Sequence, residues 1–221
     1  MTKTGGRPRS FDREVALERA LTEFWLHGYE ATSIAALTAA MGINAPSLYG
    51  AFGDKRRLFR EAIGRYRVTY GAFGGRALAE ETTAFLAIRR VLREAAHEYT
   101  DPGHPPGCMI ITAATNCTPA ADEVKAELRA LREAGRDALQ ERIAADARAG
   151  RLAPSVDVPA LAMFYAATLQ GMSTQACDGV GREALERVAD IAMTAWPDGA
   201  GTDKAGPDRA GTSTAPGHPV R

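Results

Sequence analysis

Apolar residues return at spacings of three and four along most of the 221-residue chain, which is the spacing of helices that bury one face. The pattern is clearest over residues 84–99, 123–148, 158–177 and 182–196. The chain is also rich in Ala, Leu, Arg and Glu, which favour helices. We therefore predict an all-α fold.

Two of the later helices carry an unusual amount of apolar surface. Polar residues are scarce on every side of residues 158–177, so this helix is expected to be buried all round. Residues 182–196 add a further apolar face, and one small domain cannot cover both helices. An oligomer interface is therefore predicted here.

The N-terminal part contains two short helices that meet at a sharp turn, between residues 32 and 55. Ser33 is suited to cap the first helix, and Gly42 can adopt the positive φ that ends it. Asn44 is suited to cap the second helix, and Pro46 falls in its first turn, where no intrahelical N–H is needed. The inner faces of the two helices are apolar: Ile34, Leu37, Met41, Leu48 and Phe52.

The outer face of the second helix consists of short side chains around one phenol: Ala45, Pro46, Ser47, Tyr49, Gly50 and Ala51. A face this small can enter the major groove of DNA closely. Groups that can bind phosphates lie on either side of it, at Arg7, Arg9, Thr32, Ser33 and Lys55. We predict a helix-turn-helix that contacts double-stranded DNA through these residues and Asn44. An ordinary helical hairpin within a bundle is the alternative.

An ordered set of residues extends this motif in both directions, from residue 13 to residue 59. Its members are residues 20–24, Gly28, Tyr29, residues 32–34, residues 42–44, Leu48, Tyr49, Phe52, Asp54, Lys55, Leu58 and Phe59. This set resembles the TetR family of bacterial transcriptional regulators. The resemblance implies a three-helix DNA-binding domain, residues 11–60, and a helical ligand-binding and dimerisation domain, residues 61–196. A disordered basic arm at residues 1–10 and a disordered tail at residues 197–221 are expected outside them.

A third N-terminal helix is predicted from Asp54, which is suited to the N-cap. The resemblance implies that this helix connects the DNA-binding domain to the rest of the chain. Four glycines lower helix propensity along its later part, at positions 64, 71, 74 and 75. We expect the helix to break near Gly74 and Gly75.

Charge and cysteine content narrow the functional class. The chain has 27 basic and 27 acidic residues, but its first 70 residues hold 11 Lys and Arg against 7 Asp and Glu, so the part with the helix-turn-helix is basic. No phosphate-binding glycine loop, zinc-ligand spacing or Gly-x-Ser-x-Gly elbow is present, so we predict neither an enzyme nor a cofactor. Unpaired cysteines and the lack of a signal peptide or membrane span favour the cytoplasm.

A small-molecule pocket in the C-terminal domain is implied by the family resemblance. Candidate lining residues are polar or soft side chains on otherwise apolar helices: Tyr99, Cys108, Met109, Thr112, Asn116, Met163, Phe164, Tyr165, Thr168, Gln170 and Met172. Ordinary core packing is the alternative for each of them. His97, His104 and Cys108 match no usual zinc spacing, so no metal site is predicted.

Cys108 follows Gly107 at the expected start of a helix, where the helix dipole would lower the pKa of an exposed thiol. A cysteine-based sensor of oxidants or electrophiles is therefore an alternative function, and an inert buried thiol is the opposing interpretation.

Together these features predict a ligand-responsive, homodimeric transcriptional repressor that binds a near-palindromic operator and is released by a small-molecule effector. A small-molecule enzyme and an architectural DNA-binding protein without an effector are the rival classes.

Overall fold

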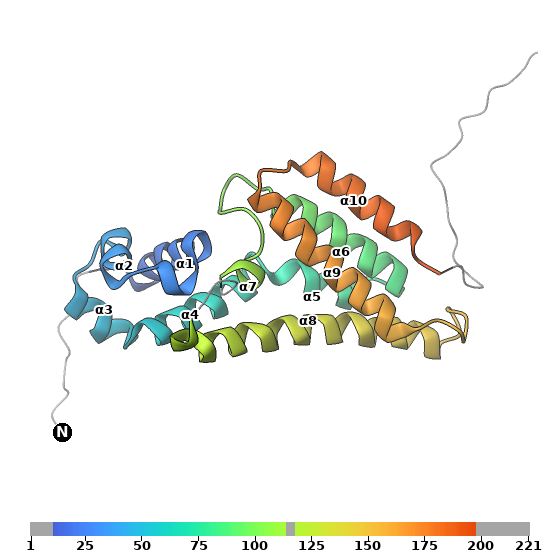
Figure 1. The fold of residues 1–221 in the computed structure, drawn as a ribbon, viewed down its shortest axis with the longest axis horizontal. Helices are drawn as coiled ribbons and strands as arrows, with labels where there is room; N and C mark the ends of the chain where they lie inside the picture. The colour runs from blue at the N-terminus through green and yellow to red at the C-terminus, as the bar shows by residue number, and fades with distance from the viewer. Residues whose placement is uncertain (1–10, 114–117, 198–221) are drawn as a thin grey trace, which may run out of the picture.

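The computed structural model describes residues 11–113 and 118–197, and these residues contain helices and no strand. The all-α prediction is confirmed. Figure 1 shows an elongated molecule with α1 to α4 at one end and the remaining long helices at the other. The expected arm with Arg7 and Arg9, the candidate Asn116, and the tail from residue 198 lie outside the described residues.

The N-terminal bundle consists of α1 (Arg13–Ala31), α2 (Ile34–Met41), α3 (Ala45–Phe52) and α4 (Lys55–Val68). Its core is made of side chains that the helical spacing turns inward: Leu21, Phe24, Trp25, Leu37, Leu48, Phe52, Leu58 and Phe59. Gly28 has a φ of 76° and interrupts the helical geometry of α1.

The C-terminal bundle consists of α5 (Ala72–Glu80), α6 (Ala84–Glu98), α8 (Asp122–Arg148), α9 (Val158–Cys177) and α10 (Arg182–Thr194). A second core joins them, with Ile88, Leu92, Leu139, Ile143, Tyr165, Leu185 and Trp196 among its buried members. The short α7 (Met109–Thr112) and the 3₁₀ turn η1 (Pro119–Ala121) lie between α6 and α8 in the sequence.

The break after α4 lies earlier than the glycine content predicted. It falls at residues 69–71, and α5 continues through Gly74 and Gly75. Gly71 accounts for its position, because a Cβ there would lie 2.8 Å from a ring carbon of Tyr66. Within α5, burial of Phe73 and Ala77 offsets the low helix propensity of the two glycines.

The helix α9 is not buried on every side, contrary to the prediction. Met163 and Phe164 are 51% and 42% exposed in the single chain. Val188 and Ile191 on α10 are also exposed. These side chains leave an uncovered apolar surface on the two helices for which an oligomer interface was predicted.

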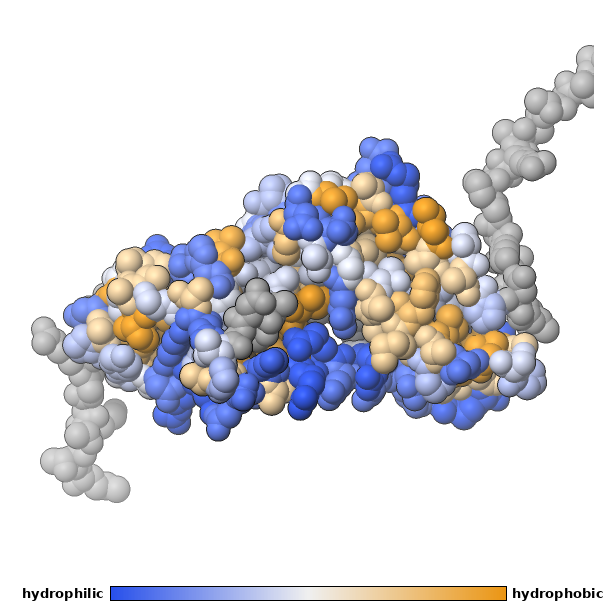
Figure 2. Space-filling model, in the orientation of Figure 1, coloured by the Kyte–Doolittle hydropathy of each residue, from blue (hydrophilic) through white to orange (hydrophobic). Residues whose placement is uncertain are grey.

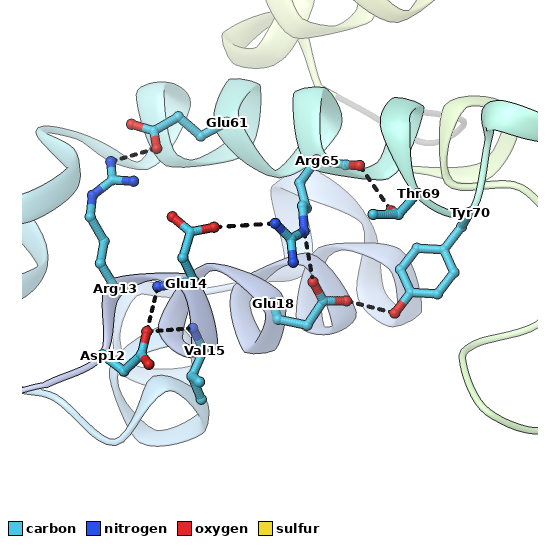
Figure 3. Close-up of polar contacts among 9 residues, drawn as sticks. All are labelled: Asp12, Arg13, Glu14, Val15, Glu18, Glu61, Arg65, Thr69 and Tyr70. Atoms are coloured by element: carbon cyan, nitrogen blue, oxygen red, sulfur yellow. Dashed lines mark hydrogen bonds and ion pairs between the residues drawn. The ribbon is translucent and has the colours of Figure 1, made fainter.

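Polar contacts fix α1 against α4 on the outside of the N-terminal bundle, and Figure 3 shows them along the facing sides of the two helices. Arg13 pairs with Glu61 at 2.6 Å, and Arg65 lies 3.3 Å from the Glu18 carboxylate. The Tyr70 hydroxyl donates to Glu18 at 2.6 Å, and this hydrogen bond raises the pKa of Tyr70 to about 12. Because Glu18 binds both groups, it joins α1 to α4 and to the turn that follows α4.

The two bundles are joined by packed side chains as well as by the chain connection. Met109 and Ala113 at α7, with Val124 and Leu128 at the start of α8, belong to the N-terminal core. The Glu127 carboxylate of α8 binds Arg60 and Arg56 of α4, and these arginines lower its pKa to about 2. The expected domain boundary after residue 60 therefore falls inside α4.

Gly28 lies against the backbone of Ala113, just after α7, and the next residue, Tyr29, donates its N–H to the Ala113 carbonyl at 2.9 Å. We expect Gly28→Ala to lower the free energy of unfolding by about 1–3 kcal/mol, because its φ is positive and a Cβ would meet the Ala113 oxygen at 3.0 Å. Urea denaturation measures the loss. The control is Gly64→Ala, which has open space around its Cβ within α4 and should leave stability equal or higher. Equal stability of the Gly28 variant and the native chain would contradict the role given to this glycine.

Candidate nucleic-acid interface and ligand cavity

The helix α3 is capped at its N-terminus and packed on one side, which leaves its other side free. The Asn44 side chain accepts from the Ser47 N–H at 2.9 Å, so it caps the helix as predicted. Leu48 and Phe52 are buried in the N-terminal core. Tyr49 on the opposite side is 50% exposed, and a Cβ on Gly50 would meet nothing within 4 Å. The result is a short, rigidly held helix with a small outward face.

The turn before α3 has the predicted geometry. Gly42 has a φ of 68° and ends α2, and Ser33 caps α2 by accepting from the Ala36 N–H at 3.0 Å. A shallow hollow beside the turn is lined by residues of α2, α3 and the segment before α1: Phe11, Thr38, Ala39, Gly42, Ile43, Asn44 and Ser47. Both short helices therefore border one accessible surface.

Two predicted phosphate contacts are placed differently. Thr32 is only 1% exposed, and its hydroxyl donates to the Gly28 carbonyl at 2.6 Å, so it is a structural residue within the bundle. Lys55 is half-buried, with its ammonium 3.3 Å from the Glu30 carbonyl and 4.5 Å from the centre of the Tyr29 ring. The chain's own groups thus bind both side chains.

A cavity of about 630 Å³ opens where α4, α5, α6, α7, α8 and α9 approach one another. Figure 2 shows a hollow between α8 and the helices above it, with hydrophilic residues on the α8 side. The walls of the cavity are mostly apolar and include Val68, Phe73, Leu78, Val91, Ile110, Ile111, Leu131, Leu139, Ala166 and Leu169. A volume of this size is typical of small-molecule sites.

The cavity contains few of the residues that the sequence indicated. Tyr99, Cys108 and Gln170 line it. Seven other described candidates do not: Met109, Thr112, Met163, Phe164, Tyr165, Thr168 and Met172. Met109 and Met172 are fully buried in the cores, and Thr112 lines a separate hollow near Trp25. The orientation of α9 about its axis explains the remaining candidates, which all lie on this helix. Ala166, Leu169 and Gln170 face the cavity, and the other candidate side chains of α9 face other directions.

Sequence reasoning missed the α8 and α5 walls, with Phe73, Arg132 and Arg136 among their residues. A signal was present in the small residues Ala134, Gly135 and Ala138, which leave room beside the helix.

At the inner wall of the cavity, Cys108 lies between two phenols. The Tyr66 hydroxyl donates to its sulfur at 3.2 Å, and Tyr99 also contacts the sulfur by a hydrogen bond. Burial raises the pKa of the Cys108 thiol. The lowering expected for an exposed thiol does not arise, because α7 has only four residues and burial outweighs any effect of its dipole.

No cluster of three metal-ligating side chains exists among residues 11–113 and 118–197. In the same part of the chain, no helix is both long and apolar enough to cross a bilayer. His104, which was considered as a ligand, instead stacks on Trp25 with ring centres 4.7 Å apart.

A capped helix-turn-helix joined to a second helical bundle is the architecture of a DNA-binding transcriptional regulator, and the chain belongs to the TetR family. Residues 16–62 match the family model described as bacterial regulatory proteins, tetR family. Residues 85–191 match the model described as tetracyclin repressor-like, C-terminal domain. The chain is therefore a DNA-binding transcriptional regulator and not an enzyme.

Individual relatives agree with this assignment. The HTH-type transcriptional repressor ComR of Escherichia coli is 34% identical over 89% of this chain and 94% of its own length. The repressor BdcR of the same organism is 34% identical over 56% of this chain and 62% of its own length. A structure of a cysteine mutant of the TetR family regulator CifR, complexed with 26-bp double-strand operator DNA, has a TM-score of 0.83 and 42% identity, covering 86% of this chain and all of that one.

The capping role of Asn44 can be separated from a role at the DNA surface. We expect Asn44→Asp to keep the cap and leave the free energy of unfolding within about 0.5 kcal/mol, while its negative charge weakens binding to any duplex about tenfold. Asn44→Ala should instead lose about 1 kcal/mol of stability. Urea denaturation and fluorescence anisotropy with labelled duplexes give the two readouts. Unchanged DNA affinity of the Asp variant would place this helix end away from DNA.

Proposed function

We propose that the protein is a homodimeric repressor whose two α3 helices enter successive major grooves of a near-palindromic operator and which a small-molecule effector releases. The observation that carries the proposal is the exposed, small-faced α3, connected by the single helix α4 to an apolar cavity of about 630 Å³. The relatives support it, since ComR is a repressor and CifR is complexed with operator DNA.

On the DNA side, Ala45, Pro46, Ser47 and Gly50 are proposed to approach base edges, because their side chains are too short to hold the helix away from the groove. Ser33 and Tyr49 are proposed as phosphate contacts, and the arginines of the N-terminal arm as minor-groove contacts. Thr32 and Lys55 are not among the proposed contacts, because the Thr32 hydroxyl and the Lys55 ammonium already bind carbonyl groups of the chain. Binding an operator requires access to the chromosome, so we propose that the protein is located in the cytoplasm.

Dimerisation is proposed through α9 and α10. Four large apolar side chains are exposed on these helices: Met163, Phe164, Val188 and Ile191. Covering them with a second copy would remove apolar surface from water and place two α3 helices in a symmetric arrangement, so that two equivalent half-sites are read.

Release is proposed to follow from movement of α4 and α7. Tyr66 lies near the end of α4 and lines the cavity, and the other end of α4 packs against α1 and α3. Since a ligand shifts an equilibrium only by binding one state more tightly, the effector must prefer the arrangement that does not fit the operator.

In vitro selection from randomised duplexes tests the proposal. We expect the native chain to select sites with two-fold symmetry and half-sites one or more helical turns apart. Ile191→Asp, at a side chain that is 69% exposed, should yield monomers and lower operator affinity at least about tenfold, because a charge cannot be buried in an apolar interface.

Sedimentation measures the mass of each variant. The control is Val15→Asp, at an exposed position on α1. Only the mass of this variant is compared, and it should remain dimeric. Selected sites without symmetry, or a monomeric native chain that binds its operator fully, would contradict the proposal.

A cysteine-based response is a second candidate, favoured by the position of Cys108 in the cavity wall. In a chain with Cys117→Ser and Cys177→Ser, we expect N-ethylmaleimide to lower operator affinity. Burial raises the pKa of Cys108, so the reactive thiolate is scarce at pH 7, and the modification rate should rise about tenfold per pH unit from pH 7 to 9.

Mass spectrometry follows the modification, and adding Cys108→Ser to the same chain is the control. A rate that levels off below pH 8 would contradict the raised pKa. Full operator binding by the modified protein would exclude Cys108 as a sensor.

A further inference from the structure

The charged residues that line the cavity all have one sign. Four arginines contribute to its walls: Arg67 at the end of α4, Arg76 on α5, and Arg132 and Arg136 on α8. No Asp or Glu is among its described lining residues. The chain as a whole has equal numbers of acidic and basic residues, so this distribution is a local feature of the cavity.

These arginines have donor groups to spare. Within the described part of the chain, Arg67 and Arg76 form no ion pair. Arg132 donates to the Ile110 carbonyl at 2.8 Å, and Arg136 binds its sequence neighbour Asp137 at 2.9 Å. A guanidinium has five N–H donors arranged to match a carboxylate, so the walls can bind an anion without first losing an internal partner at Arg67 or Arg76.

The remaining lining suits a hydrocarbon body. Phe73, Leu78, Val91, Leu139 and Leu169 provide apolar surface. The two phenols at the inner wall are already hydrogen-bonded to Cys108. A polyol would leave most of its hydroxyls without partners against these walls, and a cation would meet arginines with no carboxylate to balance it.

We propose that the effector is an amphipathic monocarboxylate, with its carboxylate at the arginines and its hydrocarbon body against the apolar walls. This inference rests on the proposed function, since it names the class of ligand for the same cavity.

The arginines also offer a route to the DNA-binding end. Arg132 holds α7 through the Ile110 carbonyl, and α7 is followed by Ala113, whose carbonyl accepts from the Tyr29 N–H of α1. A carboxylate that binds Arg132 draws its guanidinium towards the ligand and away from that carbonyl. Binding therefore weakens the hold of α8 on α7, and through it the contact of α7 with α1.

The experiment compares ligands that share a body and differ in charge. Isothermal titration of the full chain uses decanoate, decanamide and decylamine, and 2-naphthoate with 2-naphthamide as a second pair. We expect each acid to bind at least about tenfold more tightly than its amide, because the carboxylate adds an opposite charge to its hydrogen bonds with guanidinium. Decylamine should bind more weakly than either. Each acid should also lower the affinity for the selected operator.

Variants locate the binding. Arg67→Gln and Arg76→Gln together should remove most of the preference of acid over amide, and the loss of affinity should be larger for each acid than for its amide. The matched control is Arg148→Gln on α8, an exposed arginine that does not line the cavity, and its preference should equal that of the native chain.

Three results would overturn the assignment of an anionic ligand. They are equal affinities for acid and amide, a failure of both acids to bind, and a preference for the acid that persists in the double variant. Failure of the proposed function is distinct, because it would appear as loss of symmetric operator selection in the absence of any ligand.

Discussion

The packing of α4 against both bundles is the constraint on which the rest of the structure depends. This helix has 14 residues and spans about 21 Å at 1.5 Å per residue. Asp54 fixes its start by accepting from the Arg57 N–H at 2.8 Å, and its buried residues Leu58, Phe59 and Ala62 belong to the N-terminal core. Tyr66, one turn further on, forms part of the cavity wall. One helix thus packs in the N-terminal core and lines the cavity, so a rigid movement of α4 at one end also moves its other end.

The second connection between the bundles is built differently, from a short helix held by a few hydrogen bonds and by the buried side chain of Met109. The helix α7 has four residues, and its flanking backbone bonds to α1 at Ala113 and to α9 through the Cys108 N–H and the Ser173 hydroxyl at 2.8 Å. So short a helix has little stability of its own. Its position therefore depends on its neighbours, whereas α4 is long enough to reach from the N-terminal core to the cavity.

Local chemistry explains which parts of this arrangement were predictable from sequence. The caps at Ser33, Asn44 and Asp54 and the turn at Gly42 depend on residues within four positions of each other, and all have the predicted geometry. The cavity combines residues from six helices, so no local pattern marks it. Thr32 was misassigned for a related reason, because the sequence does not show that its hydroxyl finds a partner in Gly28.

The helix α9 connects the cavity to the surface proposed for dimerisation. Ala166 and Leu169 face the cavity, while Met163 and Phe164 lie on the exposed side of the same helix. Protein interiors are close-packed, so a ligand that displaces the cavity-facing side chains must shift or rotate the helix. A rotation would carry the exposed side chains with it and alter how two copies meet. The spacing of two recognition helices would then depend on the cavity by two routes, through α4 within each chain and through α9 between chains.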